Sequence, residues 1–239
     1  MSGAALAEGD GLRTLDRSSA EARVRGGGRV ILTELTTVTL RAARSLALAA
    51  GQADLELPTG AAPLQVEVGG ARISVRAGEG PALARIRLRD GTVQVTAYAG
   101  TARVEGPREA ALELAAGSGI SVASAGAPAQ EKLLPAPLTS APAPGSAPDH
   151  ANPRLWWEDV PGAAGYTVEV CHDEACAGLE DRGVAVVGAP WAPEGLPLGD
   201  LYWRVAAVSA SGLDGMPSQP VKFTIRSLWR KPHPRPPAS

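Results

Sequence analysis

The two cysteines of the chain, Cys171 and Cys176, are the first candidates for chemistry, at the ends of the run Cys-His-Asp-Glu-Ala-Cys. A disulfide between them would close a loop of six residues and stabilise the fold by roughly 2 kcal/mol through lost unfolded-chain entropy. It would also require an oxidising compartment. The alternatives are two free thiols, or a metal site that adds His172 and Asp173. Because no third cysteine or second nearby histidine completes a tetrahedral set, we expect the disulfide.

The remaining groups that could act in catalysis are scattered. The three histidines, His150, His172 and His233, fall in an expected linker, loop and tail. A local acidic loop is formed by Asp173, Glu174, Glu180 and Asp181. An acid and a nucleophile should instead come from separate elements held about 5–10 Å apart. The sequence also contains no serine nucleophile elbow, no His-Glu-x-x-His and no phosphate-binding glycine loop. It therefore predicts no enzyme, no metal and no cofactor.

The aromatic residues divide the chain. Of the 239 residues, the only aromatic before position 150 is Tyr98, and all five tryptophans follow it. Between the two halves lies a stretch rich in proline, alanine and serine, which favours extended conformations over packed elements. We therefore expect a first β domain over 1–125, a linker over 126–153 that leaves the domains free to orient, a second β domain over 154–226 and a disordered proline-rich tail over 227–239.

The first half shows the alternation of apolar and polar residues that a half-buried strand requires. The clearest runs are 29–35, 64–68, 72–76, 85–89 and 92–96, each closed by a glycine turn. Asp90-Gly91 predicts a two-residue hairpin. The run 40–50 could be a short helix, but strand is favoured because its neighbours are β-rich. With no aromatic filling, a thin sandwich or a solenoid-like stack is expected, and the balanced charges indicate a solvated outer face.

The order of several short motifs in residues 4–124 resembles that of FecR-type domains. Gly9 to Thr14 is similar to their opening G-D-x-(L/V)-x-T, and Thr37 to Leu40 to their T-x-(L/V)-x-L strand. Later steps are similar at Leu46 to Gly51, Ala99 to Val104 and Leu114 to Gly117. The resemblance implies a β-rich, extracytoplasmic and non-enzymatic module. In the name-giving proteins such domains relay transporter occupancy to a sigma factor through a membrane helix and a cytoplasmic segment, neither of which these residues contain.

The second half resembles fibronectin type III and related immunoglobulin-like sandwiches over residues 154–226. The motifs are L-x-W-x-x-V-x-G-A-x-x-Y-x-V-x-V, from Leu155 to Val170, and W-R-V-x-A-V, from Trp203 to Val208. A gap of about 10 Å between two sheets needs large side chains to fill it. Trp157 and Trp203 are therefore expected in the core, and the run with Val221, Phe223 and Ile225 is expected to close the domain.

The neighbours of those core tryptophans are expected on the surface. If Trp157 and Trp203 point inward, Trp156 and Tyr202 point outward, and exposed aromatics can stack on sugars or peptides. Together with Arg204 they form the candidate binding surface of the sequence. The family arrangement places the two strands in different sheets, so a single platform is not expected.

Charge and location complete the sequence interpretation. The net charge is −2 and the pI is near 6.0, which argues against nucleic acid as a partner and against a polybasic membrane patch. No apolar run reaches the roughly 20 residues of a membrane span, and residues 1–10 show no export signal, so the chain is either cytosolic or the trimmed piece of an exported protein. The sequence predicts a periplasmic or extracellular binding or scaffold protein of a bacterial envelope, with an envelope protein or a cell-wall polysaccharide such as peptidoglycan as partner. The alternative is the periplasmic sensory part of a FecR-like trans-envelope signalling system.

Overall fold

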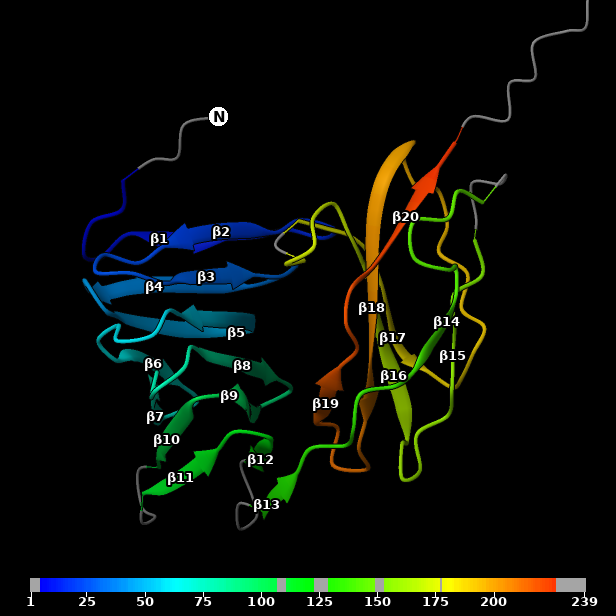
Figure 1. The fold of residues 1–239 in the computed structure, drawn as a ribbon. Helices are drawn as coiled ribbons and strands as arrows, with labels where there is room; N and C mark the ends of the chain where they lie inside the picture. The colour runs from blue at the N-terminus through cyan, green and yellow to red at the C-terminus, as the bar shows by residue number, and fades with distance from the viewer. Residues whose placement is uncertain (1–4, 107–110, 123–128, 149–152, 177, 227–239) are drawn as a thin grey trace, which may run out of the picture.

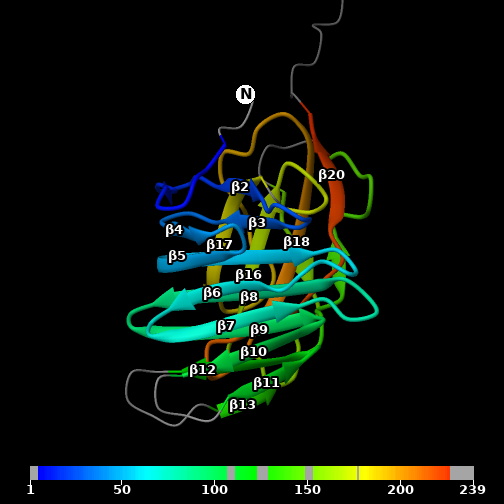
Figure 2. The ribbon, with the colours of Figure 1, turned by 90° about the vertical axis from the view of Figure 1, so that its left-hand side faces the viewer.

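The computed structural model describes residues 5–106, 111–122, 129–148, 153–176 and 178–226. Every helix or strand assigned in these ranges is a strand, which confirms the all-β prediction. Two β-sheet bodies lie side by side, with the strands of one running across the direction of the other (Figures 1 and 2). The tail 227–239, expected to be disordered, lies outside the described residues.

The first domain has two layers of strands. One layer, called here the outer sheet, has the order β1-β4-β5-β6-β7-β10-β11. The other, called the docking sheet, has the order β2-β3-β5-β8-β9-β12-β13. The bounds are β1 Gly11–Arg13, β2 Ala20–Arg23, β3 Arg29–Leu32, β4 Thr37–Ala42, β5 Ser45–Leu57, β6 Leu64–Val68, β7 Ala71–Arg76, β8 Ala82–Arg89, β9 Thr92–Ala99, β10 Thr101–Glu105, β11 Leu112–Ala115, β12 Ser118–Val122 and β13 Ala129–Lys132.

Strand β5 belongs to both layers. Its first residues pair with β4 and, in parallel, with β6, whereas its second half from Gly51 onward pairs with β8 and β3. Gly51 adopts φ +87°, and a Cβ there would lie 2.5 Å from the Cα of Thr36. The strand can therefore pass from one sheet to the other only because residue 51 has no side chain.

The space between the two layers is filled by small aliphatic side chains. Buried valine, leucine, isoleucine and alanine residues from both sheets form one core cluster, including Leu32, Leu55, Ile73, Ile86 and Leu114. The alternation of the sequence is therefore realised as a thin sandwich. The Asp90-Gly91 hairpin joins β8 to β9 with both residues at positive φ, and the run 40–50 is strand, as expected.

The second domain is also a two-layer sandwich. A five-stranded sheet has the order β17-β16-β18-β19, with β20 also paired to β18, and a two-stranded sheet pairs β14 with β15. The bounds are β14 Thr139–Ala141, β15 Trp156–Trp157, β16 Gly165–Cys171, β17 Leu179–Val186, β18 Gly199–Val208, β19 Asp214–Pro217 and β20 Val221–Ile225.

Aromatic side chains fill the core of this second sandwich. The ring of Trp157 lies 5.3 Å from that of Tyr166 and 6.5 Å from that of Trp203, measured between centroids. Val221, Phe223 and Ile225 of β20 are buried in the same cluster. Trp157 and Trp203 are 4% and 0% exposed, so their prediction as core residues is confirmed.

The segment 126–153 differs from the free linker that its composition suggested. Its described part contributes β13 to the first domain and β14 to the second. The Leu133 N–H donates to the carbonyl of Gly117 in the first domain, while the carbonyl of Leu134 accepts from the N–H of Met216 in the second. Because the consecutive residues Leu133 and Leu134 are hydrogen-bonded to different domains, no free segment of chain separates the domains at this point. Independent orientation of the domains was therefore the wrong expectation.

Candidate functional site

The two domains meet through a polar face of each. The docking sheet faces the sheet that contains β16, β18 and β19 (Figure 1), and ion pairs join Arg85 of β8 to Glu169 of β16 and to Asp214 of β19. All seven residues of β16 are buried, including Thr167 and Glu169, which point away from the aromatic core. The polar face of β16, which carries Thr167 and Glu169, is covered by the first domain.

Arg85 of β8 is the centre of this interface. Its guanidinium makes a two-pronged contact with Asp54 of β5, with Nε–Oδ1 at 2.8 Å and Nη2–Oδ2 at 2.7 Å. From the same side chain, Nη1 lies 2.9 Å from the Asp214 carboxylate and Nη2 lies 3.4 Å from that of Glu169. One planar cation thus binds a carboxylate of its own sheet and two of the facing domain, in the geometry that arginine suits best.

Asp214 of β19 ties the interface at a second point. Its Oδ2 accepts from Arg87 Nη2 at 2.5 Å as well as from Arg85, and its Oδ1 accepts from the Thr167 hydroxyl at 2.9 Å. Burial disfavours the charged form of this carboxyl, but Arg87 and Arg85 outweigh it and hold the pKa of Asp214 below its ordinary value. Asp214 therefore remains an anion between two domains.

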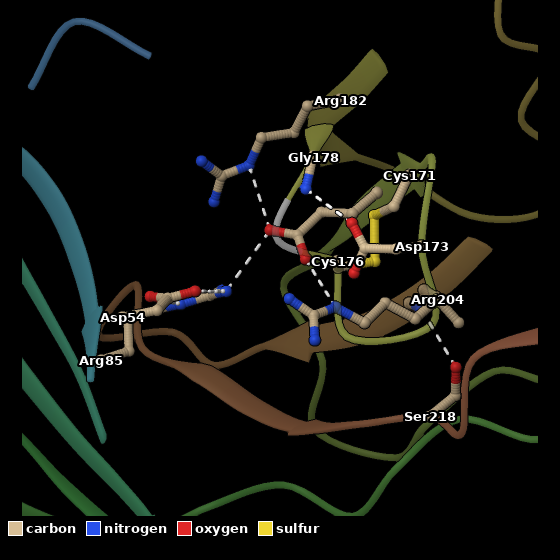
Figure 3. Close-up of a disulfide and its surroundings, with 11 residues drawn as sticks. Asp54, Arg85, Cys171, Asp173, Cys176, Gly178, Arg182, Arg204 and Ser218 are labelled. Carbon is tan, nitrogen blue, oxygen red and sulfur yellow. Dashed lines mark hydrogen bonds and ion pairs between the residues drawn. A yellow bond between two sulfur atoms is a disulfide. The ribbon is translucent and has the colours of Figure 1, made fainter. Parts of the chain in front are cut away.

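Glu169 of β16 binds the remaining cations, of which Arg182 and Arg204 are labelled in Figure 3. Its Oε2 lies 2.7 Å from Arg204 Nε, and its Oε1 lies 3.7 Å from Arg182 Nε and 3.4 Å from Arg85. Burial works against ionisation here too, yet Arg204, Arg85 and Arg182 together hold the pKa of Glu169 far below its usual range. A glutamate held in this way cannot act as a general base near neutral pH.

Gln52 and Glu131 extend the same interface on both sides. The Gln52 Oε1 atom accepts from Arg87 and, at 3.1 Å, from Arg182 Nη2 of the second domain. Glu131 of β13 accepts from the hydroxyls of Ser209 and Ser211 at 2.6 and 2.8 Å. The domains are therefore joined by a continuous polar network.

A cavity of about 270 Å³ opens within this interface. It lies where the docking sheet faces the loop that follows β19. Its polar lining includes Tyr98, Arg85, Glu169 and Arg204, and its apolar lining includes Ile31. Both domains contribute to its walls, so its shape depends on the docked arrangement.

Cys171 and Cys176 form a disulfide beside the cavity, with the sulfurs 2.03 Å apart. The bond closes the loop after β16, which also holds Asp173, whose Oδ2 accepts from the N–H of Gly178 at 2.8 Å. Ala175 of this loop lines the cavity. The cysteines therefore fix a loop at the edge of the interface.

The candidate binding residues of the sequence are separated in the structure. Trp156 lies on β15, 42% exposed, whereas Tyr202 lies half-buried on β18 in the other sheet. Arg204 points into the domain interface, where it pairs with Glu169. The structure therefore does not join these three residues into one surface, as expected for the two aromatics, and gives Arg204 an internal partner.

The expectation of a solvated face for the charges of the first half was wrong for the docking sheet. Arg85 is 7% exposed. It pairs with Asp54 of its own sheet, and Arg87 beside it pairs with Asp214 of the second domain. Sequence reasoning missed this site because alternation identifies the residues that face away from a core but not what covers them. The one local signal was Glu169, the single charged residue of β16, between Val168 and Val170.

Two further observations concern the described ranges alone. They contain no group of three or more His, Cys, Asp or Glu side chains arranged to hold a metal ion. No helix in them has the length and apolar character to cross a membrane.

Comparison with known proteins gives limited information. No family model and no curated protein matches the chain. Two crystal structures of a candidate anti-sigma factor from Parabacteroides distasonis match with 18% and 17% identity and TM-scores of 0.42 and 0.43. Each match covers 52% of this chain and 59% of the other, so the chain spans less than two thirds of those proteins.

A third match is the extracellular domain of a candidate one-component system from B. thetaiotaomicron, with 10% identity and a TM-score of 0.28. It covers 87% of this chain and 37% of the other. Likenesses of this size do not assign a family. The FecR-type and fibronectin type III assignments therefore stay predictions from sequence motifs.

Proposed function

We propose that the chain is a non-enzymatic binding or scaffold protein of a bacterial cell envelope, in which two β domains act as one rigid unit. The observation that carries this proposal is the use of the charged side chains. Arg85, Glu169 and Asp214, the most buried charged groups of the interface, neutralise one another across the domain boundary. Groups engaged in mutual ion pairs fix geometry and are not available for proton transfer.

The disulfide supports a location outside the cytoplasm. Disulfides form and persist in oxidising compartments and are rare where cellular thiols keep cysteines reduced. The bond between Cys171 and Cys176 closes a loop at the edge of the domain interface. The disulfide therefore lies next to the surface through which the domains contact each other. Partners of the proposed protein are an envelope protein or peptidoglycan, and the exposed Trp156 is the aromatic best placed to contact one.

Location is tested in intact cells of the source bacterium. A membrane-impermeant thiol reagent is added before and after reduction, and protease is added to spheroplasts. We expect no labelling of Cys171 and Cys176 until a reductant is present, and digestion of the protein in spheroplasts without lysis. Free thiols together with protection from protease would place the protein in the cytoplasm and refute the proposal.

Binding is tested by co-sedimentation with purified peptidoglycan sacculi. We expect Trp156→Ala to lower the bound fraction several-fold, whereas Leu138→Ala, at another exposed apolar side chain of the second domain, leaves it unchanged. Equal loss in both variants would show that general surface hydrophobicity, and not Trp156, mediates the contact.

The sensory alternative is favoured by one feature, the coupling of two domains around a shared cavity, which suits a protein that changes state when occupied. The two functions differ in their effect on transcription. In a strain carrying Asp214→Asn, a signalling role predicts altered transcription of a restricted set of genes, measured by RNA sequencing. A scaffold role predicts a change in envelope integrity without such a set.

A further inference from the structure

Three large apolar side chains of the described ranges are buried without belonging to the core of either domain. Ile31, Leu133 and Leu213 are 4%, 6% and 1% exposed, yet none of them is part of the two core clusters. Ile31 lies on β3, Leu133 follows β13, and Leu213 lies in the loop between β18 and β19. Leu213 is the most buried of the three, so the residues that cover it matter most.

Leu213 of the second domain packs over a glycine of the first. A Cβ atom at Gly119 of β12 would lie 3.3 Å from Leu213 Cδ1, 3.2 Å from Leu133 Cδ2 and 3.1 Å from the Val95 carbonyl oxygen. Gly119 is not among the glycines with positive φ, so close packing, and not backbone freedom, accounts for a glycine in this strand. A larger residue at position 119 would push Leu213 away from the docking sheet.

Hydrogen bonds surround this apolar contact. The hydroxyls of Ser209 and Ser211 donate to Glu131 of β13 at 2.6 and 2.8 Å. Gln94 Nε2 of β9 donates to the carbonyl of Ser211 at 3.3 Å. Figure 1 shows the loop between β18 and β19 at the same end of the molecule as β12 and β13. A buried apolar side chain enclosed by polar contacts is the usual arrangement of an anchor residue in a protein interface.

The ion pairs alone do not account for the docking of the domains. Removing charged groups from water costs free energy that their mutual attraction only about offsets, so a buried network fixes geometry with little net gain in stability. Burial of an apolar side chain is favourable without that cost. Ile31 lines the cavity between the domains, whereas Leu213 packs over the space that Gly119 leaves. Leu213 is therefore the side chain best placed to supply the net attraction between the domains.

We propose that Leu213 is the anchor of domain docking, and that its release opens the molecule into two separate, folded domains. The opening takes place at the junction of Leu133 and Leu134, whose hydrogen bonds go to different domains. Each domain stays folded because neither core cluster contains a residue of the other domain. The open form exposes the face of the docking sheet that carries Arg85.

This inference rests on the proposed function, since it identifies what holds the two domains together as one rigid unit. Its test makes no use of cellular location or of peptidoglycan. If Leu213 proves dispensable for docking, the envelope proposal still stands. A cytoplasmic location or a failure to bind sacculi would leave the result of the docking test unchanged.

The test is the rate at which a thiol reagent labels the full chain carrying Ile31→Cys. Position 31 is buried on β3, four strands away from β12 in the docking sheet, so the reagent reaches it only when the domains separate. In this background we expect Leu213→Ala to raise the labelling rate at least about thirtyfold, because loss of the anchor increases the population of the open form. Gly119→Val, which fills the space from the other domain, should also raise it.

Matched variants separate docking from general stability. Leu155→Ala makes the same change at a fully buried leucine in the core of the second domain. Gly11→Val places a valine on β1, where the nearest listed atom to the new Cβ is the Val38 carbonyl oxygen at 3.7 Å. Both controls should leave the labelling rate unchanged. In every variant, mass spectrometry checks that the native disulfide is intact, and near-UV circular dichroism checks the packing of the aromatic core.

Three outcomes would overturn the proposal. The first is an unchanged labelling rate in Leu213→Ala and Gly119→Val, which would mean that other contacts hold the domains together. The second is an equal increase in Leu155→Ala or Gly11→Val, which would make the effect one of general stability. The third is loss of the near-UV signal in Leu213→Ala, because Leu213 would then support the core of the second domain.

Discussion

The two sheets of the first domain carry similar alternating charges but use them in opposite ways. On the outer sheet, Arg103 and Glu105 pair at 2.7 Å with both side chains more than 40% exposed. On the docking sheet, Arg85 and Asp54 also pair at 2.7 Å, but with side chains 8% and 18% exposed. The bond lengths are equal and the surroundings differ. Ion pairs in water contribute little, whereas buried ones cost a great deal when one partner is removed.

The largest effect is expected from removing a charge in the buried interface. Asp214→Asn keeps the shape of the side chain but leaves Arg85 and Arg87 without a carboxylate that each now contacts. We expect the free energy of unfolding to fall by about 3–5 kcal/mol, measured by urea denaturation. If Glu105→Gln on the outer sheet costs as much, burial is not what distinguishes the two faces.

Acid should reproduce that change in the unmodified protein. The folded-state pKa values of Asp214 and Glu169 are lowered, so their stabilising contribution is fully present above the unfolded-state carboxyl pKa of about 4 and is lost as the pH falls below it. Urea titrations from neutral to acid pH should therefore show stability falling steadily in acid. Asp214→Asn should give a shallower slope, and parallel slopes would contradict the assignment of that loss to the interface.

The sequence predicted the interior of each domain well because alternation records which side chains face a core. Trp157 and Trp203 were expected inside and are inside, and the Asp90-Gly91 turn joins the strands that it was expected to join. Each of these predictions depends on residues close in the sequence or on a single sheet face.

The interface could not be predicted in the same way. Asp54 and Asp214 both contact Arg85, but their positions in the sequence are far apart and no local pattern links them. The proline-rich composition of 126–153 also pointed away from docking, whereas Leu133 and Leu134 bind to different domains. The one usable signal was Glu169, the single charged residue of β16, because a charge needs a partner when both faces of its strand are covered.

The crossing of β5 from the outer sheet to the docking sheet at Gly51 is expected to give the next largest loss of stability. In Gly51→Ala the new Cβ would lie within 2.5 Å of Thr36 atoms at φ +87°, while in the control Gly60→Ala, at φ +75°, nothing lies within 4 Å. We expect Gly51→Ala to lower the free energy of unfolding by about 3 kcal/mol and Gly60→Ala by about 1 kcal/mol. Equal losses in urea denaturation would mean that backbone strain alone, and not the crossing of β5, sets the cost.

The disulfide is expected to contribute less to the free energy of unfolding than Asp214 or Gly51. Replacing both Cys171 and Cys176 by serine reopens a loop with a sequence separation of five, and the loss should be roughly 2 kcal/mol. Reducing agent should destabilise the unmodified protein by the same amount and leave the double variant unchanged. A further loss in the double variant under reduction would show an effect of the reagent that does not involve this bond.

The smallest loss of stability is expected from the exposed ion pair of the outer sheet. Its dependence on salt should differ from that of the docking sheet. Glu105→Gln should cost about 0–1 kcal/mol at low salt, because both partners of this pair are in water. The screening length falls from about 10 Å at 0.1 M to about 3 Å at 1 M salt, so the loss should vanish in urea titrations with 1 M sodium chloride. The loss caused by Asp214→Asn should persist there, because ions do not enter the space between the domains. If salt erased both losses, the buried network would have to be open to solvent and the domains would not be docked in solution.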